Sequence, residues 1–314
     1  MTLLSILALT LIGCGDKDGD DTATDGGTGD GGGTGVDISA YINVTDAHQG
    51  DIDSCCELGG SGATSDCWDG SSWIVQAIDS TKQVDAALVG NIADFESGDP
   101  VADATLSLWF LNDPTVGAPD YSVVGDADGI VASTFKTCTP IAYKTSTDPA
   151  LDATVDTYEI NQIEAYTEGT IDTEFNSVSS TTYAIIPSLL GVSPDGDKGT
   201  IAGAAYDCGG APIKGAQVVV RDPSTGEIPE SLVVKYFVDS FPNRNQPYTS
   251  EDGLWVAINV PEGTWDVELY VADGDGGHTN IGKTIAYIFP GSIMISNVYT
   301  GFGDGKRYPD ICLL

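Results

Sequence analysis

Positive charge is scarce in this sequence of 314 residues. Twelve lysine and arginine residues stand against 47 aspartate and glutamate residues, and the formal net charge is −35 at pH 7. Such a negative chain repels phosphate groups, so nucleic acid is a poor partner for it. The same repulsion argues against binding anionic lipid through the folded part of the chain.

Histidine is rarer still, with His48 and His278 as its two representatives. Neither has a glutamate three positions later, and no zinc-protease motif occurs. The Gly-x-Ser-x-Gly motif of serine hydrolases is also missing. Ser133 and Lys136 match Ser-x-x-Lys, but they lie in an apolar alternating run that predicts a strand, on which they would point to opposite faces. We therefore expect no catalytic activity.

Apolar runs long enough to span a bilayer as a helix are absent from the N-terminal region. Residues 1–13 are apolar but too short for this role. The segment Leu11-Ile-Gly-Cys14 resembles a bacterial lipobox, which would make residues 1–14 a lipoprotein signal peptide with Cys14 as the lipidated residue. No basic residue precedes the apolar run, which departs from the usual signal peptide. Gly15 after the cysteine favours the outer membrane over the inner one.

Residues 15–35 lack apolar side chains and consist mainly of aspartate, glycine and threonine. Such a segment cannot bury enough surface to offset the entropy of ordering. We expect a disordered tether that links a lipid anchor to the folded part.

The seven cysteines contain no Cys-x-x-Cys pair, so their spacing does not favour a zinc site. Lipidation of Cys14 would leave an even number, which in an exported protein predicts three disulfides. These candidates are Cys55, Cys56, Cys67, Cys138, Cys208 and Cys312. We expect Cys208 in its turn to pair with Cys312, because a C-terminal tail must be tied down. Cys138 and the Cys55, Cys56 and Cys67 cluster would form the other two bonds.

An internal repeat organises the rest of the chain. Residues 90–108 and 203–220 both contain an opening glycine, an aspartate, a proline and an alanine before an apolar run. The matched pairs are Gly90 and Gly203, Asp94 and Asp207, Pro100 and Pro212, Ala104 and Ala216, and Gly129 and Gly253. A repeat of strand-and-turn patterns predicts two related all-β modules.

The second copy resembles the carboxypeptidase regulatory-like family, a transthyretin-like β-sandwich. The resemblance covers residues 199–300 well and 88–145 more weakly, where Asp103 replaces a glycine. Its motifs are Gly203, Asp207-Cys-Gly-Gly210, Pro212, Gly215-Ala216, Asp252-Gly253 and Val260-Pro-Glu-Gly263. The resemblance implies two transthyretin-like or Ig-like antiparallel β-sandwich modules in tandem. We place module 1, with a cysteine-rich N-terminal extension, at residues 36–195 and module 2 at residues 196–314.

Two alternating segments in module 2, residues 254–260 and 263–271, predict a hairpin. The register that keeps apolar residues opposite each other places Val256 opposite Val267. It sends Trp255 outward, on the face that also carries Asp266, Glu268 and Tyr270. An aromatic pair with two carboxylates suits sugar binding. The alternative is that these rings lie under the loop of residues 241–248 or against module 1.

Aspartate pairs in turns raise the question of calcium. They are Asp51 and Asp53, Asp126 and Asp128, and Asp273 and Asp275. None of these loops supplies the four or more oxygen ligands that calcium sites use, and aspartate is common in tight turns. We expect no cofactor, with calcium as the alternative.

These observations together predict a non-enzymatic cell-surface lipoprotein, held at the outer membrane by its N-terminal lipid. Its folded part would bind a polysaccharide or an envelope protein, or would serve a structural role. The alternative is an accessory subunit of an envelope peptidase or outer-membrane transporter, because the family it resembles is often appended to both. A hydrolase with an unrecognised site is a third possibility. Motifs that specify a fold leave the ligand open.

Overall fold

The computed structural model describes residues 73–150, 153–272 and 278–314. These residues form three β-sheets, one α-helix and short 3-10 turns, which confirms the all-β class and the sandwich-like arrangement. The predictions for residues 1–14, for the tether at residues 15–35 and for Cys14, Cys55, Cys56 and Cys67 concern residues outside the described part of the chain.

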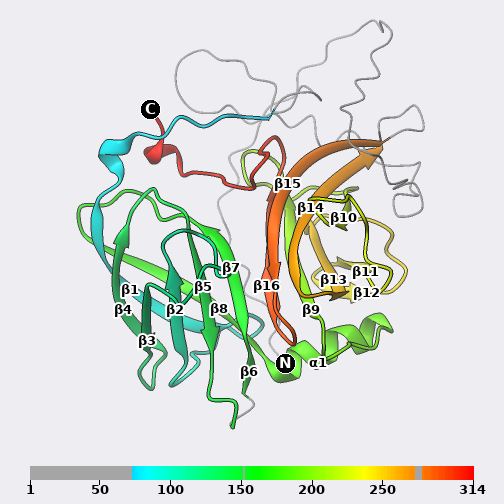
Figure 1. Cartoon of the computed structure of the whole chain (residues 1–314), viewed down its shortest axis with the longest axis horizontal. Helices are drawn as coiled ribbons and strands as arrows, with labels where there is room; N and C mark the ends of the chain where they lie inside the picture. The colour runs from blue at the N-terminus through cyan, green and yellow to red at the C-terminus, as the bar shows by residue number, and fades with distance from the viewer. Residues whose placement is uncertain (1–72, 151–152, 273–277) are drawn as a thin grey trace, which may run out of the picture.

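A ten-stranded sheet runs through the middle of the molecule (Figure 1). Its strands, in spatial order, are β12 (Phe241–Asn243), β11 (Val233–Val238), β13 (Leu254–Val260), β9 (Gly199–Tyr206), β16 (Ile293–Ile295), β7 (Thr157–Gln162), β5 (Ile141–Ser146), β2 (Thr105–Trp109) and β3 (Tyr121–Val124). The short strand β17 (Val298–Tyr299) pairs with β9 off this path. Because β7 pairs with β16, this sheet joins the two repeats into one structure.

Two smaller sheets pack against it. The four-stranded sheet contains β4 (Ile130–Lys136), β1 (Asp85–Asp94), β8 (Thr170–Ser179) and β6 (Thr154–Val155). The three-stranded sheet contains β10 (Gln217–Arg221), β14 (Gly263–Ala272) and β15 (His278–Ile288). Tyr143 belongs to the core under the four-stranded sheet and Tyr158 to the other core. Tyr143 of β5 lies opposite Glu159 of β7, so these two side chains point to the same face of the large sheet. Tyr158 is next to Glu159 and points to the other face, so the two cores lie on opposite faces of this sheet.

The internal repeat is confirmed in the strand pairing. In the first copy β1 pairs with β4 in antiparallel and β8 in parallel fashion, and in the second β9 pairs with β13 and β16 in the same way. Gly129 and Gly253 both have a positive φ, 73° and 68°. A Cβ on either would lie 2.7 Å from the Ile92 oxygen or 2.6 Å from the Ala205 oxygen. Both positions therefore require glycine.

The expectation of purely antiparallel modules is corrected, because the sheets are mixed. β8 runs parallel to β1, and β16 runs parallel to both β7 and β9. The connection from β7 to β8 and the one from β15 to β16 each carry the chain from one sheet to another. A strand that arrives in this way can pair in either direction.

The helix α1 (Ser180–Leu190) follows β8 directly. Ser179 caps its N-terminus by accepting a hydrogen bond from the Thr182 amide at 3.1 Å, and Gly191 ends it in the left-handed conformation. Leu190 packs on Val256 and Ile258 of β13. The helix therefore covers the face of β13 that is turned away from the second core.

The disulfide observed in the described part joins Cys138 to Cys312, with their Cα atoms 5.4 Å apart. The predicted pairing of Cys208 with Cys312 is wrong, and so is the predicted bond of Cys138 to the Cys55, Cys56 and Cys67 cluster. The C-terminal tail passes the Cys208 turn, where the Arg307 side chain donates to the Cys208 carbonyl at 2.8 Å, and continues to the first repeat (Figure 1). There the Leu314 amide donates to the Ala77 carbonyl at 3.0 Å, which places Cys312 beside Cys138.

Candidate ligand-binding cleft

The four residues predicted to form an outward binding face do not share one face. Trp255 is only 1% exposed and lies in the second core, so its predicted outward position is wrong. The predicted hairpin is absent because β13 and β14 belong to different sheets. β13 is covered on both faces, by the core and by α1, so its apolar alternation could not indicate which face looks inward.

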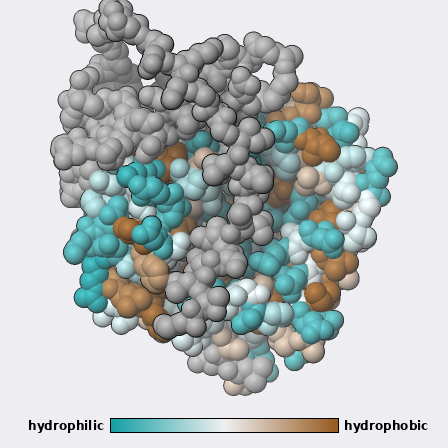
Figure 2. Space-filling view, turned by 180° about the vertical axis from the view of Figure 1, so that it is seen from behind, coloured by the Kyte–Doolittle hydropathy of each residue, from teal (hydrophilic) through white to brown (hydrophobic). Residues whose placement is uncertain are grey.

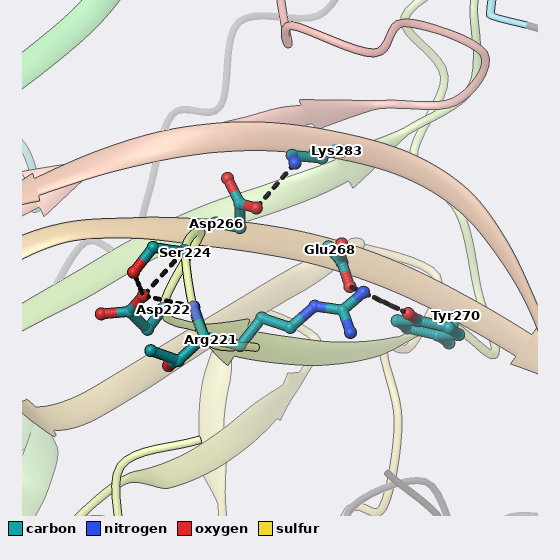
Figure 3. Close-up of polar contacts among 8 residues, drawn as sticks. Arg221, Asp222, Ser224, Asp266, Glu268, Tyr270 and Lys283 are labelled. Atoms are coloured by element: carbon teal, nitrogen blue, oxygen red, sulfur yellow. Dashed lines mark hydrogen bonds and ion pairs between the residues drawn. The ribbon is translucent and has the colours of Figure 1, made fainter. Parts of the chain in front are cut away.

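The other three predicted residues, Asp266, Glu268 and Tyr270, do share a face of β14, but all three are buried. They belong to a network of charged side chains (Figure 3). Arg221 of β10 forms an ion pair with Glu268 and donates to the Tyr270 hydroxyl at 3.1 Å. Tyr270 in turn donates to Glu268 at 2.8 Å, and Lys283 of β15 contacts Asp266 at 2.6 Å. The carboxylates of Asp266 and Glu268 are thus each already paired with a positive charge within the protein.

The network changes the ionisation of its members. Burial disfavours the charge of Arg221, but the hydrogen bond and the charge of Glu268 raise its pKa above the usual value. Burial, together with the Glu268 charge, raises the pKa of Tyr270 to about 12. Near neutral pH the network therefore holds a charged guanidinium and a neutral phenol, an arrangement that fixes β10 to β14.

A cleft of about 370 Å³ opens beside this network, between β10 and β11. It exists because β10 is the last strand of its sheet in the described structure, while β11 pairs with β13 in the other sheet. Apolar side chains and polar side chains both line it. They are Gln217, Val218, Val219, Ile228, Leu232, Val234, Lys235, Tyr236, Arg244, Asn245, Gln246 and Pro247.

Three backbone groups on β10 or just before it are hydrogen-bonded to side chains or backbone across the cleft region. The Tyr236 hydroxyl accepts from the Val218 amide at 2.9 Å, and burial raises the pKa of this phenol. Thr249 accepts from the Ala216 amide at 2.9 Å through its side chain, and its own amide donates to the Ala216 carbonyl. These three groups are therefore not available to a ligand in the cleft.

Two cations stand at the cleft. Arg244 donates to the carbonyls of Leu189 and Ser188 at the C-terminal end of α1, at 2.5 and 3.0 Å. Lys235 donates to the Arg244 carbonyl at 3.2 Å. No aspartate or glutamate is among the described residues that line the cleft. Sequence reasoning missed both cations, because nothing in their spacing marks them as neighbours.

A second depression, of about 540 Å³, lies at the end of the first repeat. Asp94, Glu96 and Asp99 line it together with several hydroxyl groups. Asp94 accepts from the Ser179 amide at 3.1 Å, and Glu96 accepts from the Thr182 hydroxyl at 2.5 Å. These carboxylates thus serve the junction of β8 and α1.

The remaining predictions about chemistry can be placed in the structure. Asp126 accepts hydrogen bonds from the amides of Asp128 and Ile130, both at 2.9 Å, as a turn residue does. The other two aspartate pairs lie outside the described residues. Within the described ranges no three His, Cys, Asp or Glu side chains are grouped to hold a metal. Ser133 and Lys136 lie on β4 at an odd separation, as predicted, and so point to opposite faces.

Apolar and hydrophilic side chains are interspersed on the face shown in Figure 2. The described part of the chain has no helix with the length and apolar character needed to cross a bilayer.

No family model and no curated protein matches this chain. Among solved structures, it is similar to the Bacillus anthracis TIE protein at 14% identity and a TM-score of 0.23, over 69% of this chain and 34% of that one. It is similar to the shaft pilin SpaA of Lactobacillus rhamnosus GG at 10% identity and a TM-score of 0.23, over 69% and 98%. It is similar to catechol 1,2-dioxygenase from Acinetobacter at 14% identity and a TM-score of 0.20, over 31% of this chain and 53% of that one. Similarities this low carry no argument about function.

Proposed function

We propose that this chain is a non-enzymatic binding protein of the bacterial cell surface, and that the cleft between β10 and β11 is its binding site. The observation that carries the proposal is the cleft itself. Its volume lies within the range of small-ligand sites, and its lining combines apolar side chains with polar groups that could orient a ligand. A polysaccharide or an envelope protein is the expected ligand.

The test compares ligand capture by two variants with a bulky residue on an exposed position. Asn245→Trp fills the cleft, whereas Thr134→Trp adds the same ring on β4 of the first repeat. We expect a glycan array and a pull-down from envelope extracts to give ligands that bind the wild type and Thr134→Trp but not Asn245→Trp. Equal binding by all three would place the site elsewhere, and no ligand for any of them would contradict a binding function.

The proposed location rests on the sequence Leu11-Ile-Gly-Cys14 and the polar segment that follows it. Lipidation of Cys14 would hold the protein at the outer membrane. A fatty-acid analogue supplied during growth should label the wild type and not Cys14→Ala. Equal labelling of the two would contradict lipidation at this cysteine.

A further inference from the structure

The charged side chains that line the cleft are positive, whereas the chain as a whole is negative. Six of the basic residues form ion pairs with aspartate or glutamate within 4.0 Å. These are Lys144, Lys198, Lys214, Arg221, Lys283 and Lys306. Five described basic residues form no such pair with a described residue: Lys82, Lys136, Lys235, Arg244 and Arg307. Of these, Lys235 and Arg244 line the cleft. In a chain of net charge −35, a site with two cations and no lining carboxylate favours an anionic ligand.

Arg244 is held in place by the helix end. Its Nε and one terminal nitrogen donate to the last carbonyls of α1, which uses two of the five N–H donors of the guanidinium. The donors that remain are fixed by these two bonds. A guanidinium held in this way can bind a carboxylate through two parallel hydrogen bonds without first losing side-chain entropy.

An extended peptide fits the cleft less well than a sugar. Peptides that add to a sheet edge gain affinity from backbone hydrogen bonds. Four such groups on β10 or next to its ends are used: the Val218 amide by Tyr236, the Ala216 amide and carbonyl by Thr249, and the Asp222 amide by the Glu227 carbonyl at 2.8 Å. The side-chain donors among the lining residues include the two cations and the amides of Asn245 and Gln246. Such groups suit hydroxyls and a carboxylate.

We infer that the cleft binds a uronic acid unit of an acidic polysaccharide, with Arg244 and Lys235 recognising its carboxylate. This inference rests on the proposed function and specifies its ligand. The cleft volume of about 370 Å³ is at the small end for ligand sites, which suits one or two sugar units better than a longer segment.

Calorimetric titration of the full chain tests the inference. The probes are trimers of galacturonate, glucuronate and mannuronate, each beside its carboxyl-reduced counterpart, and an acetylated hexaglutamate peptide as the acidic protein-like probe. We expect at least one uronate trimer to bind, its reduced counterpart to bind at least tenfold more weakly, and the peptide not to compete. Higher ionic strength should weaken the uronate complex, because salt screens the attraction.

Variants connect the binding to the two cations. Lys235→Gln leaves the cap of α1 intact and should raise Kd about tenfold, as expected for the loss of one charge-assisted hydrogen bond. Arg244→Lys keeps the charge and loses the two-pronged geometry, so it should also weaken binding. Lys136→Gln removes one positive charge from β4 in the first repeat and should leave Kd unchanged. Equal melting temperatures for Lys235→Gln and the wild type would show that the fold is intact.

The outcomes separate this inference from the proposed function. If the reduced trimers bind as well as the uronates, and Asn245→Trp abolishes both, the cleft is a binding site but not one for carboxylates. If hexaglutamate binds in preference, the ligand is an acidic protein and the inference is overturned. If no uronate trimer binds the wild type, the inference also fails, while the glycan array and the pull-down still decide the proposed function.

Discussion

The two repeats differ in the strand that follows their second strand. In the first repeat β3 pairs with β2 and extends that sheet, whereas in the second β11 pairs with β13 in the opposite sheet. The Tyr236 hydroxyl then takes the place of a neighbouring strand by accepting from the Val218 amide of β10. One change of strand partner thus leaves an edge that opens a cleft in the second repeat.

The ends of the two repeats also differ, because a disulfide joins the C-terminal tail, which follows the second repeat, to the first repeat. Replacing Cys138 and Cys312 together by serine removes a link between residues 174 positions apart. In the chain-entropy model this should lower the free energy of unfolding by about 5 kcal/mol. Urea denaturation of the double variant and the wild type measures the loss. Non-reducing peptide mapping that joined Cys312 to another cysteine would overturn the assignment.

Trp255 and Val131 occupy the same position in the two repeats, each opposite the opening glycine, Gly203 or Gly90. Both are buried, but the tryptophan is far larger. We expect Trp255→Ala to cost about 4 kcal/mol and Val131→Ala about 2 kcal/mol, because the cost follows the volume of the cavity. Thermal and urea unfolding test this. A Trp255→Ala variant that melts with the wild type would mean that the ring lies on the surface after all.

Two ion pairs of the second repeat differ in their burial. The Glu268 side chain, paired with Arg221, is 5% exposed, whereas that of Glu251, paired with Lys214, is 74% exposed. Glu268→Gln should cost about 2 kcal/mol, since it leaves a partly buried guanidinium with a weaker partner. Glu251→Gln should cost less than about 1 kcal/mol. Equal effects in urea denaturation would show that the network of Figure 3 is open to solvent.

Glu159 offers a contrast with Glu268, because the hydrogen-bond partners of its carboxylate are neutral. Tyr143 donates to it, and burial raises the pKa of Glu159. Burial, followed by the Glu159 charge, also raises the pKa of Tyr143. Between the ordinary pKa of 4.5 and the raised value, the folded state binds more protons than the unfolded state, so stability falls as pH rises through this window.

Glu159→Gln removes that titration. We expect the variant to gain stability relative to the wild type as pH rises from about 4.5 through the folded pKa, and the difference to become constant above it. Urea unfolding at a series of pH values, with Glu251→Gln as the exposed control, measures this. Parallel curves for the wild type and Glu159→Gln would contradict the raised pKa.

The features that the sequence determined by itself are local. The matched glycines at 129 and 253 are required by a positive φ and by a carbonyl too close for a side chain, so the repeat could be recognised before its partners were known. Alternating apolar runs likewise predicted strands, including β4 and most of β13 and β14. These signals depend on a residue and its near neighbours along the chain.

Tertiary structure alone decided which strands pair, which face is buried and which residues form the site. β13 is apolar on both faces because a core covers one and α1 the other, so alternation could not place Trp255. Cys312 meets Cys138 because the tail crosses to the first repeat. Lys235 and Arg244 come together because β11 leaves the sheet of β10 and a helix end holds the guanidinium. Contacts between distant segments depend on how whole sheets pack, and no short stretch of sequence encodes that.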